Sequence, residues 1–284
     1  MSAAAPSFSA RPERSQERVT LPRVIRSEWT KLWTLRSTRW SLFLAFIAQA
    51  GLGPLIAEIQ MARWSTLSFQ DRIGINVIDH SLGGWHLAQL AVAILGVMTI
   101  TGEYHTGMIR SSLMAAPKRL PVLWAKLLVF SAVVLVLMLI AAFIGFLAGQ
   151  SIYTQHHLVI NGQITQISVS LNAPRALRSV FGAALYTTAT GAMCIALGTI
   201  VRRTAGGIAL FVGVFFVLPG LVEILPSTTA NAIHPYLPNN AGGAIAQAFS
   251  DGNTFSPWGG FALFCGYTVA VIAIAAVLLL RRDA

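Results

Sequence analysis

The sequence predicts an all-α membrane protein with six transmembrane helices and both termini on the cytoplasmic side. Hydrophobic residues make up 55% of its 284 residues and charged residues only 11%, whereas soluble domains carry about 25% charged residues. So few charges cannot cover the surface of a soluble protein, and we infer that lipid surrounds most of the chain. Six apolar segments agree with this, because each has the roughly 20 residues needed to cross a bilayer core about 30 Å thick.

The net charge of +10 does not indicate a nucleic-acid partner. The basic residues flank the apolar segments instead of forming a face of their own. The two cysteines, Cys194 and Cys265, fall inside apolar segments and are predicted to be small buried apolar side chains. The sequence has no metal-type spacing of Cys and His.

Residues 1–20 are rich in Ser, Ala, Pro and Arg and contain no apolar segment. This composition predicts a disordered cytoplasmic tail and not a cleavable signal peptide.

Residues 21–39 are predicted to form an amphipathic helix at the membrane interface. Its apolar residues recur at spacings of three and four, which places them on one helical face. They are Leu21, Val24, Ile25, Trp29, Leu32 and Trp33. Such a helix lies in the headgroup plane, with its cations facing anionic lipid. It serves either as a plain anchor or, with Glu28 and Thr30 on its polar side, as a contact for a protein partner.

The transmembrane domain is predicted to occupy residues 40–284. Its six helices are expected at residues 40–59, 82–101, 121–147, 176–201, 205–225 and 258–280. The orientation follows from the excess of Lys and Arg on cytoplasmic loops. If the N-terminus is cytoplasmic, 16 of the 20 Lys and Arg residues lie on that side.

The first cytoplasmic loop, at residues 103–117, is predicted to form a short transverse helix. Gly102 breaks the preceding helix, Thr106 can cap a new one, and Pro117 ends it. Met108, Ile109, Leu113 and Met114 then form an apolar patch. Such a patch suits a groove on a partner protein better than it suits a solvated connector.

Two outer loops are predicted to carry structure. Asn161-Gly162 precedes the alternating run 164–171, which predicts a small extracellular β-hairpin with a type I′ turn. Residues 241–249 of the last outer loop are apolar but too short to cross a bilayer. A short re-entrant helix that dips into the outer leaflet is expected there.

Four short segments carry a resemblance to a known family. They are residues 26–38, 102–110, 235–242 and 256–261. The first contains Arg-Ser-Glu-Trp-Thr-Lys-Leu and resembles the N-terminal signature of the type-2 ATP-binding-cassette (ABC) permeases of bacterial exporters. The second is similar to that family's first cytoplasmic loop, in which Gly-Glu-Tyr or Glu-Arg leads into Gly-Thr-Ile-Arg. Met108 departs from the pattern, since Thr or Leu is common at that position.

The resemblance implies a type-2 ABC exporter fold in a bacterial inner membrane and a homodimer with twelve helices. Each permease copy would dock on one of two ATPase subunits. The residues implied to couple the permease to the ATPase are Glu28, Glu103, Tyr104, His105, Thr106, Gly107, Met108, Ile109, Arg110 and Leu113. The first, second and fifth membrane helices would line the dimer seam and the substrate path.

The chain is not expected to be an enzyme. It lacks the Gly-x-x-x-x-Gly-Lys-Ser/Thr pattern that holds nucleotide phosphates. ATP and Mg²⁺ are therefore expected on the partner subunit, with no cofactor, metal or catalytic residue in this chain.

Three polar residues in or near the membrane segments are candidates for a substrate path or gate: Gln49, Glu58 and Glu223. The two carboxylates lie near outer helix ends, where ordinary interfacial solvation is the alternative. An ABC exporter of a lipid, peptide antibiotic or drug-like substrate is the favoured function. The alternatives are an ion-coupled secondary carrier, for which the sequence offers only one helix interruption at residues 51–54, and a non-transporting scaffold or sensor.

Overall fold

The computed structural model describes residues 21–105, 119–160, 163–249, 252 and 254–281. Six helical segments in this part of the chain are long and apolar enough to cross a membrane. They are Arg36–Ala62, Val77–His105, Leu120–Tyr153, Pro174–Val201, Thr204–Glu223 and Pro257–Arg281. The prediction of a largely helical chain with six helices long and apolar enough to cross a membrane is therefore confirmed. The predicted tail at residues 1–20 lies outside the described residues.

The N-terminal amphipathic segment is divided into two helices. Helix α1 (Leu21–Thr34) ends before Leu35, whose extended backbone starts helix α2 (Arg36–Ala62) in a new direction. Arg36 and Arg39 thus belong to the first membrane helix and not to the interface helix, which had been expected to reach residue 39. The apolar face of α1 is only partly covered, because Trp29 and Trp33 stay about half exposed, at 49% and 46%.

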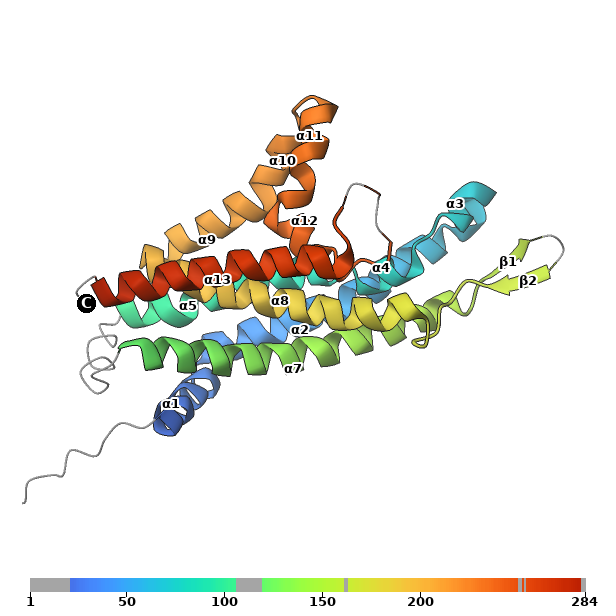
Figure 1. The fold of residues 1–284 in the computed structure, drawn as a ribbon. Coiled ribbons are helices and arrows are strands. Elements are labelled where there is room, and N and C mark those ends of the chain that lie inside the picture. Colours follow the sequence, from blue (N-terminus) through green and yellow to red (C-terminus); the bar gives the residue numbers. More distant parts are fainter. Residues whose placement is uncertain (1–20, 106–118, 161–162, 250–251, 253, 282–284) are drawn as a thin grey trace, which may run out of the picture.

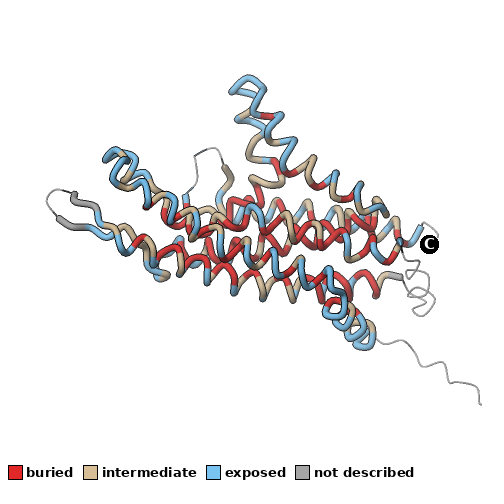
Figure 2. Tube along the Cα trace, turned by 180° about the vertical axis from the view of Figure 1, so that it is seen from behind, coloured by how far each residue is buried: buried red, intermediate tan, exposed pale blue. Residues whose placement is uncertain are grey.

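Five long helices run lengthwise in one bundle (Figure 1). They are α2, α5 (Trp85–His105), α7 (Arg119–Tyr153), α8 (Pro174–Val201) and α13 (Pro257–Arg281). Helix α8 lies at the centre and packs against α5, α7 and α13, while α2 packs against α5 and α7. In the most apolar stretch of α8, 67% of the helix is buried inside the protein, whereas in the corresponding stretch of α13 only 22% is buried. Buried residues accordingly follow the bundle axis in Figure 2.

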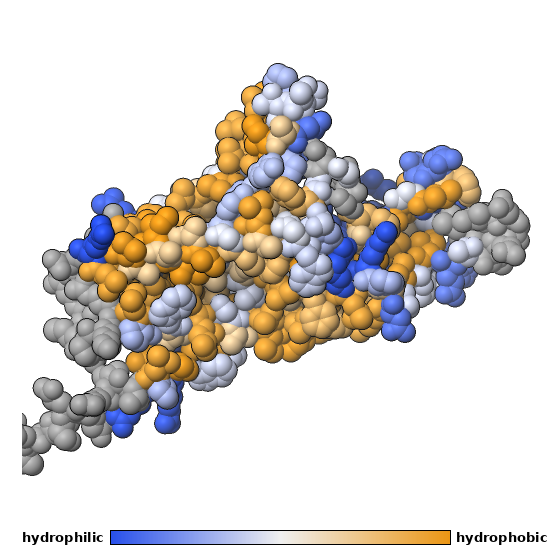
Figure 3. All heavy atoms as spheres, viewed as in Figure 1, coloured by the Kyte–Doolittle hydropathy of each residue, from blue (hydrophilic) through white to orange (hydrophobic). Residues whose placement is uncertain are grey.

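Apolar side chains also cover the outside of the bundle. On the face seen in Figure 3, apolar surface covers much of the middle and hydrophilic residues gather towards the two ends. Large apolar side chains such as Phe43, Val136 and Val269 are more than half exposed. A soluble monomer rarely exposes so much apolar surface, and a multi-pass membrane protein is therefore indicated.

The bundle end opposite α1 carries several short elements. Helices α3 (Phe69–Ile73) and α4 (Val77–Leu82) precede α5. The predicted hairpin is present as β1 (His157–Ile160) paired antiparallel with β2 (Gln163–Gln166). It is shorter than expected, because residues 167–171 leave the strand and continue towards α8.

The fifth membrane segment leans away from the bundle as an arm (Figure 1). It runs through α9 (Thr204–Val212), a π-helical turn at Gly213–Val217 and α10 (Leu218–Glu223). The chain then returns through α11 (Ser227–Ile233), a 3₁₀ turn at His234–Tyr236 and α12 (Pro238–Gly243). Helix α12 packs on α13 and α8, so a short helix does lie on the bundle there. It spans Pro238–Gly243 rather than the expected residues 241–249, so most of the predicted segment lies beyond the end of the helix.

Glycines let α2 and α5 approach their neighbours closely. A Cβ atom on Gly53 of α2 would overlap the backbone carbonyl of Ser81, and one on Gly96 would lie 2.6 Å from the Gly191 carbonyl oxygen. Small residues at such crossings bring helix backbones together, and van der Waals packing then holds them in lipid.

We expect Gly53→Ala to destabilise the protein by about 1–3 kcal/mol, because the added methyl group forces α2 away from α4. Gly51→Ala is the matched control, since a Cβ atom there would meet nothing within 4 Å. Thermal unfolding of the purified protein in mild detergent measures both variants. Equal stability of the two variants would contradict the close packing of α2 on Ser81.

The orientation in the membrane is a second testable expectation. Six crossings would place α1 and the end of α13 on the same side of the membrane, and the β1–β2 hairpin on the other. A cysteine introduced as Thr165→Cys in the hairpin should react with a membrane-impermeant maleimide on intact cells. Arg203→Cys, between α8 and α9, should react only after the cells are lysed. The reverse pattern would refute the cytoplasmic placement of the two ends.

Candidate functional site

Four charged side chains meet near the end of the bundle that carries α1. Glu28 and Lys31 come from α1, Glu103 from the last turn of α5, and Lys126 from the second turn of α7. We call these four residues the charged cluster. Lys126 Nζ lies 2.6 Å from Glu28 Oε2 and 2.9 Å from Glu103 Oε1. Lys31 Nζ lies 2.8 Å from Glu28 Oε1 and 2.9 Å from the same Glu103 oxygen.

The charged cluster is largely removed from solvent. The side chains of Lys126, Glu28 and Glu103 are 2%, 5% and 9% exposed, and that of Lys31 is 26% exposed. Burying a charge is costly unless an opposite charge and hydrogen bonds compensate it. Each carboxylate accepts from both lysines, and the four charges sum to zero. The four charges together can therefore be buried at little cost, whereas the removal of one of them would leave a buried charge uncompensated.

Lys31 is the member of the cluster nearest to water. Burial disfavours its charge, but hydrogen bonds to Glu28 and Glu103 outweigh this effect and raise the pKa of Lys31 above its ordinary value. A raised pKa stabilises the folded state fully below the ordinary lysine value, and the contribution is lost as the pH rises through the raised pKa. Lys31 is therefore charged throughout the physiological pH range.

Glu103 leaves one carboxylate oxygen for a further contact. Its Oε1 accepts from both lysines, while Oε2 is buried and has no hydrogen-bond partner among the described residues. A cavity of about 320 Å³ adjoins the cluster, between α1, α2, α5 and α7, and it is lined in part by Thr38, Met98 and Thr99. The cluster thus forms one wall of a partly polar cavity.

The position of the cluster in the chain matters mechanically. Glu103 lies at the end of α5 and Lys126 near the start of α7, so they flank residues 106–118 on both sides. Through Glu28, both helices are joined to α1. A displacement of any one of these three helices would therefore stretch or break the same set of ion pairs.

The structure brings together two of the predicted coupling residues, Glu28 and Glu103, which lie 75 positions apart in the sequence. Both residues are buried, with 4% and 7% of the whole residue exposed. A partner protein could therefore not touch them in this conformation. Tyr104 lies under the guanidinium of Arg202, 5.2 Å from its ring centre, and His105 is exposed at the end of α5. The other coupling residues, Thr106, Gly107, Met108, Ile109, Arg110 and Leu113, lie outside the described residues. The prediction that Gly102 breaks the second membrane helix is wrong, because α5 continues through Gly102 to His105. Of the transverse helix predicted at 103–117, residues 103–105 therefore belong to α5, and the rest lies outside the described residues.

The three candidate path or gate residues are not gathered at one site. Gln49 is fully buried in α2, and neither of its amide atoms has a hydrogen-bond partner among the described residues. Glu58 and Glu223 are exposed on α2 and α10. Exposure agrees with the alternative that these carboxylates are solvated near helix ends.

Lys31 and Lys126 are the cluster members that sequence reasoning did not select. Lys126 carried a usable signal, because it falls inside the apolar segment 121–147, where an ionisable residue is costly and therefore suggests a partner. Lys31 carried no comparable signal, since a lysine on the polar side of an interface helix is ordinary.

A second set of polar side chains, which are uncharged, lies inside the bundle and fixes the position of α12. The Tyr186 hydroxyl of α8 donates to Gln89 Oε1 of α5 at 2.6 Å and lies 2.9 Å from Asn239 Oδ1 of α12. Gln89 Nε2 also donates to Asn239 Oδ1, at 3.3 Å. These bonds tie α12 to the centre of the bundle although the preceding arm stands away from it.

The described residues contain no group of three or more His, Cys, Asp or Glu side chains arranged to hold a metal ion. In comparisons with known proteins, no family model matches the chain and no curated protein matches it.

We expect Lys126→Met to lower the free energy of unfolding by about 3–5 kcal/mol, because it leaves a buried carboxylate without sufficient compensation. The double variant Lys126→Met/Glu103→Gln should recover part of this loss, since the remaining Glu28–Lys31 pair is neutral. Arg203→Gln, an exposed cation at the same end of the bundle, is the control. Thermal unfolding in detergent measures all three, and a double variant less stable than Lys126→Met would contradict a mutually compensated cluster.

Proposed function

We propose that this chain is the membrane-spanning permease subunit of an ABC transporter and exports a lipid, peptide antibiotic or drug-like substrate. In this proposal two copies form a homodimer in a bacterial inner membrane, and two separate ATPase subunits supply ATP hydrolysis. The observation that carries the proposal is the charged cluster, because it joins α1 to the two helices that flank residues 106–118.

A permease without its own ATPase needs a way to pass movement from a cytoplasmic loop to its membrane helices. Glu103 in α5 and Lys126 in α7 flank residues 106–118 in the sequence, and their side chains are paired 2.9 Å apart. A pull on residues 106–118 would therefore act on α5 and α7 together, and through Glu28 also on α1. Since α8 packs on both α5 and α7, the centre of the bundle would follow.

The charge distribution favours this function over an ion-coupled carrier. A carrier needs ionisable groups near the middle of the bilayer, often at interrupted helices. The buried ion pairs of the described residues are instead near one end of α5 and α7, where they join helices to one another. A purely structural scaffold would not need mutually compensated charges on both sides of residues 106–118, a segment with several apolar residues in its sequence.

Co-expression with an ABC ATPase encoded beside the gene tests the proposal. The two proteins should purify as a complex of two permease and two ATPase copies by native mass spectrometry, with vanadate-sensitive ATP hydrolysis. If no ATPase binds, the carrier or scaffold alternatives take precedence.

The role of the cluster in coupling has its own test within that complex. Vanadate trapping should change the maleimide labelling rate of Thr165→Cys on the opposite side of the bundle. Adding Glu103→Gln should abolish this change while the complex still hydrolyses ATP. The reason is that the neutral amide of the variant cannot form ion pairs with Lys31 and Lys126. Glu58→Gln, an exposed carboxylate outside the cluster, should leave the response intact. An unchanged response in Glu103→Gln would refute coupling through the cluster.

A further inference from the structure

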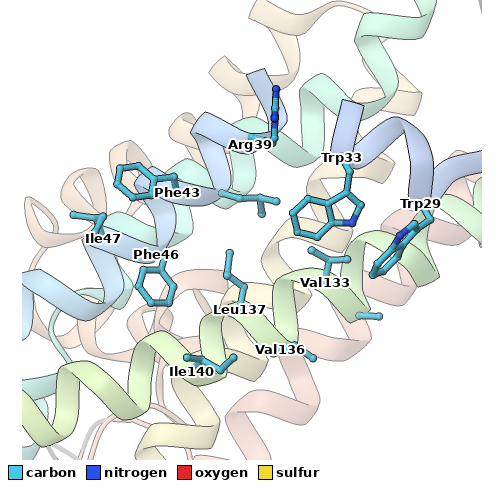
Figure 4. Close-up of a pocket in the computed structure, with 12 residues that line it drawn as sticks. Trp29, Trp33, Arg39, Phe43, Phe46, Ile47, Val133, Val136, Leu137 and Ile140 are labelled. Carbon is cyan, nitrogen blue, oxygen red and sulfur yellow. The ribbon is translucent and has the colours of Figure 1, made fainter. Parts of the chain in front are cut away.

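An apolar groove of about 680 Å³ runs along the outside of the bundle between α1, α2 and α7. Figure 4 shows Trp29 and Trp33 of α1 on one side, Phe43 and Phe46 of α2 on another, and α7 side chains across from them. The α7 side is formed by Ala132, Val133, Val136, Leu137 and Ile140. Apart from Arg39 and the two tryptophans, the residues that line this groove are aliphatic or phenylalanine.

The length of the groove matches one leaflet of a bilayer. Along α2 it reaches from Arg39 to Ile47, and along α7 from Ala132 to Ile140. Eight residues of helix extend about 12 Å, and one leaflet of a hydrocarbon core is about 15 Å deep, half of the roughly 30 Å total. An acyl chain that enters beside Arg39 would therefore lie in the groove over most of the depth of one leaflet.

The end of the groove near α1 is positively charged. Arg39 lines the groove, and together with Arg36, Trp40 and Phe43 it lines a second hollow beside it. Both arginines are exposed in the first turn of α2, and neither side chain has a hydrogen bond or ion pair with another described residue. Two cations at the start of a candidate membrane span, beside an apolar groove, complement a lipid phosphate joined to acyl chains.

The described residues offer little that could pair with these arginines. Of the described acidic residues, only Glu28 and Glu103 lie near this end, and both are buried in ion pairs with lysines. A second copy of the chain docked here in the same orientation would bring further arginines, and no described carboxylate at this end of it is exposed. The charges thus favour an anion from the membrane over a protein surface.

We propose that this groove binds one anionic phospholipid from the leaflet at the chain's two ends, with its phosphate between Arg36 and Arg39 and an acyl chain between α1, α2 and α7. The lipid would fill the gap under Trp33 and so hold α1 against α7, next to the charged cluster. This proposal does not depend on the transport function, because it concerns the described surface of the chain alone.

Native mass spectrometry of the purified chain with phosphatidylglycerol or phosphatidylcholine tests the site. The protein should retain one phosphatidylglycerol at concentrations where phosphatidylcholine is lost. Arg36→Gln/Arg39→Gln should weaken this binding roughly thirtyfold, about fivefold for each arginine–phosphate contact. Arg203→Gln/Arg281→Gln removes the same charge from the same end, outside the groove, and should bind as the unaltered protein does.

A second pair of variants tests the groove without changing charge. Val136 lines the groove and is 59% exposed, whereas Val269 on α13 is 64% exposed and lies outside it. Val136→Trp should displace the retained lipid, and Val269→Trp should not. Equal retention of the two lipids, loss of binding in both arginine double variants alike, or a lipid-free dimer that forms through the groove would each overturn the proposal.

Discussion

The mutual compensation of four buried charges is the constraint on which the α1 end of this bundle depends. Glu28, Lys31, Glu103 and Lys126 come from three helices, and none of the three more deeply buried members can lose its partners without leaving a charge in a poorly solvated place. Helices α1, α5 and α7 therefore keep their relative positions, or move together. Such a set of ion pairs makes this corner of the bundle rigid, at the ends of the two helices that flank residues 106–118.

The rest of the bundle is held by a different kind of interaction. Because lipid tails are as apolar as the side chains, burial alone does not drive membrane helices together, and close backbone packing takes its place. The contacts of Gly53 with Ser81 and of Gly96 with Gly191 show this packing. The hydrogen bonds of Tyr186 with Gln89 and Asn239 then fix the position of α12 on the central helix α8, while the arm at α9 and α10 remains largely uncovered.

The two proposals concern neighbouring parts of this corner. The charged cluster lies on the inner side of α1 and the apolar groove on its outer side, with Leu32 buried in the same helix. A lipid seated in the groove would favour the position of α1 in which Glu28 reaches Lys126. Membrane composition and the stability of the cluster would thereby be linked through one short helix.

The sequence by itself determined the membrane class, the six helices long and apolar enough to cross a bilayer, and most of the hairpin. Each of these depends on local composition or spacing, which the bilayer thickness and turn geometry impose directly. The resemblance of the sequence to a known family also singled out Glu28 and Glu103. The position of Lys126 inside an apolar segment indicates in addition that this lysine has a buried partner. Only the tertiary structure decided that these residues compensate one another, that α1 ends at Thr34, and that Gln49 and the exposed Glu58 and Glu223 form no common site. The physical reason is that the cost of a buried charge depends on its partners, and three of the four ion pairs of the cluster join residues 23 to 98 positions apart. No local pattern encodes which helices will meet.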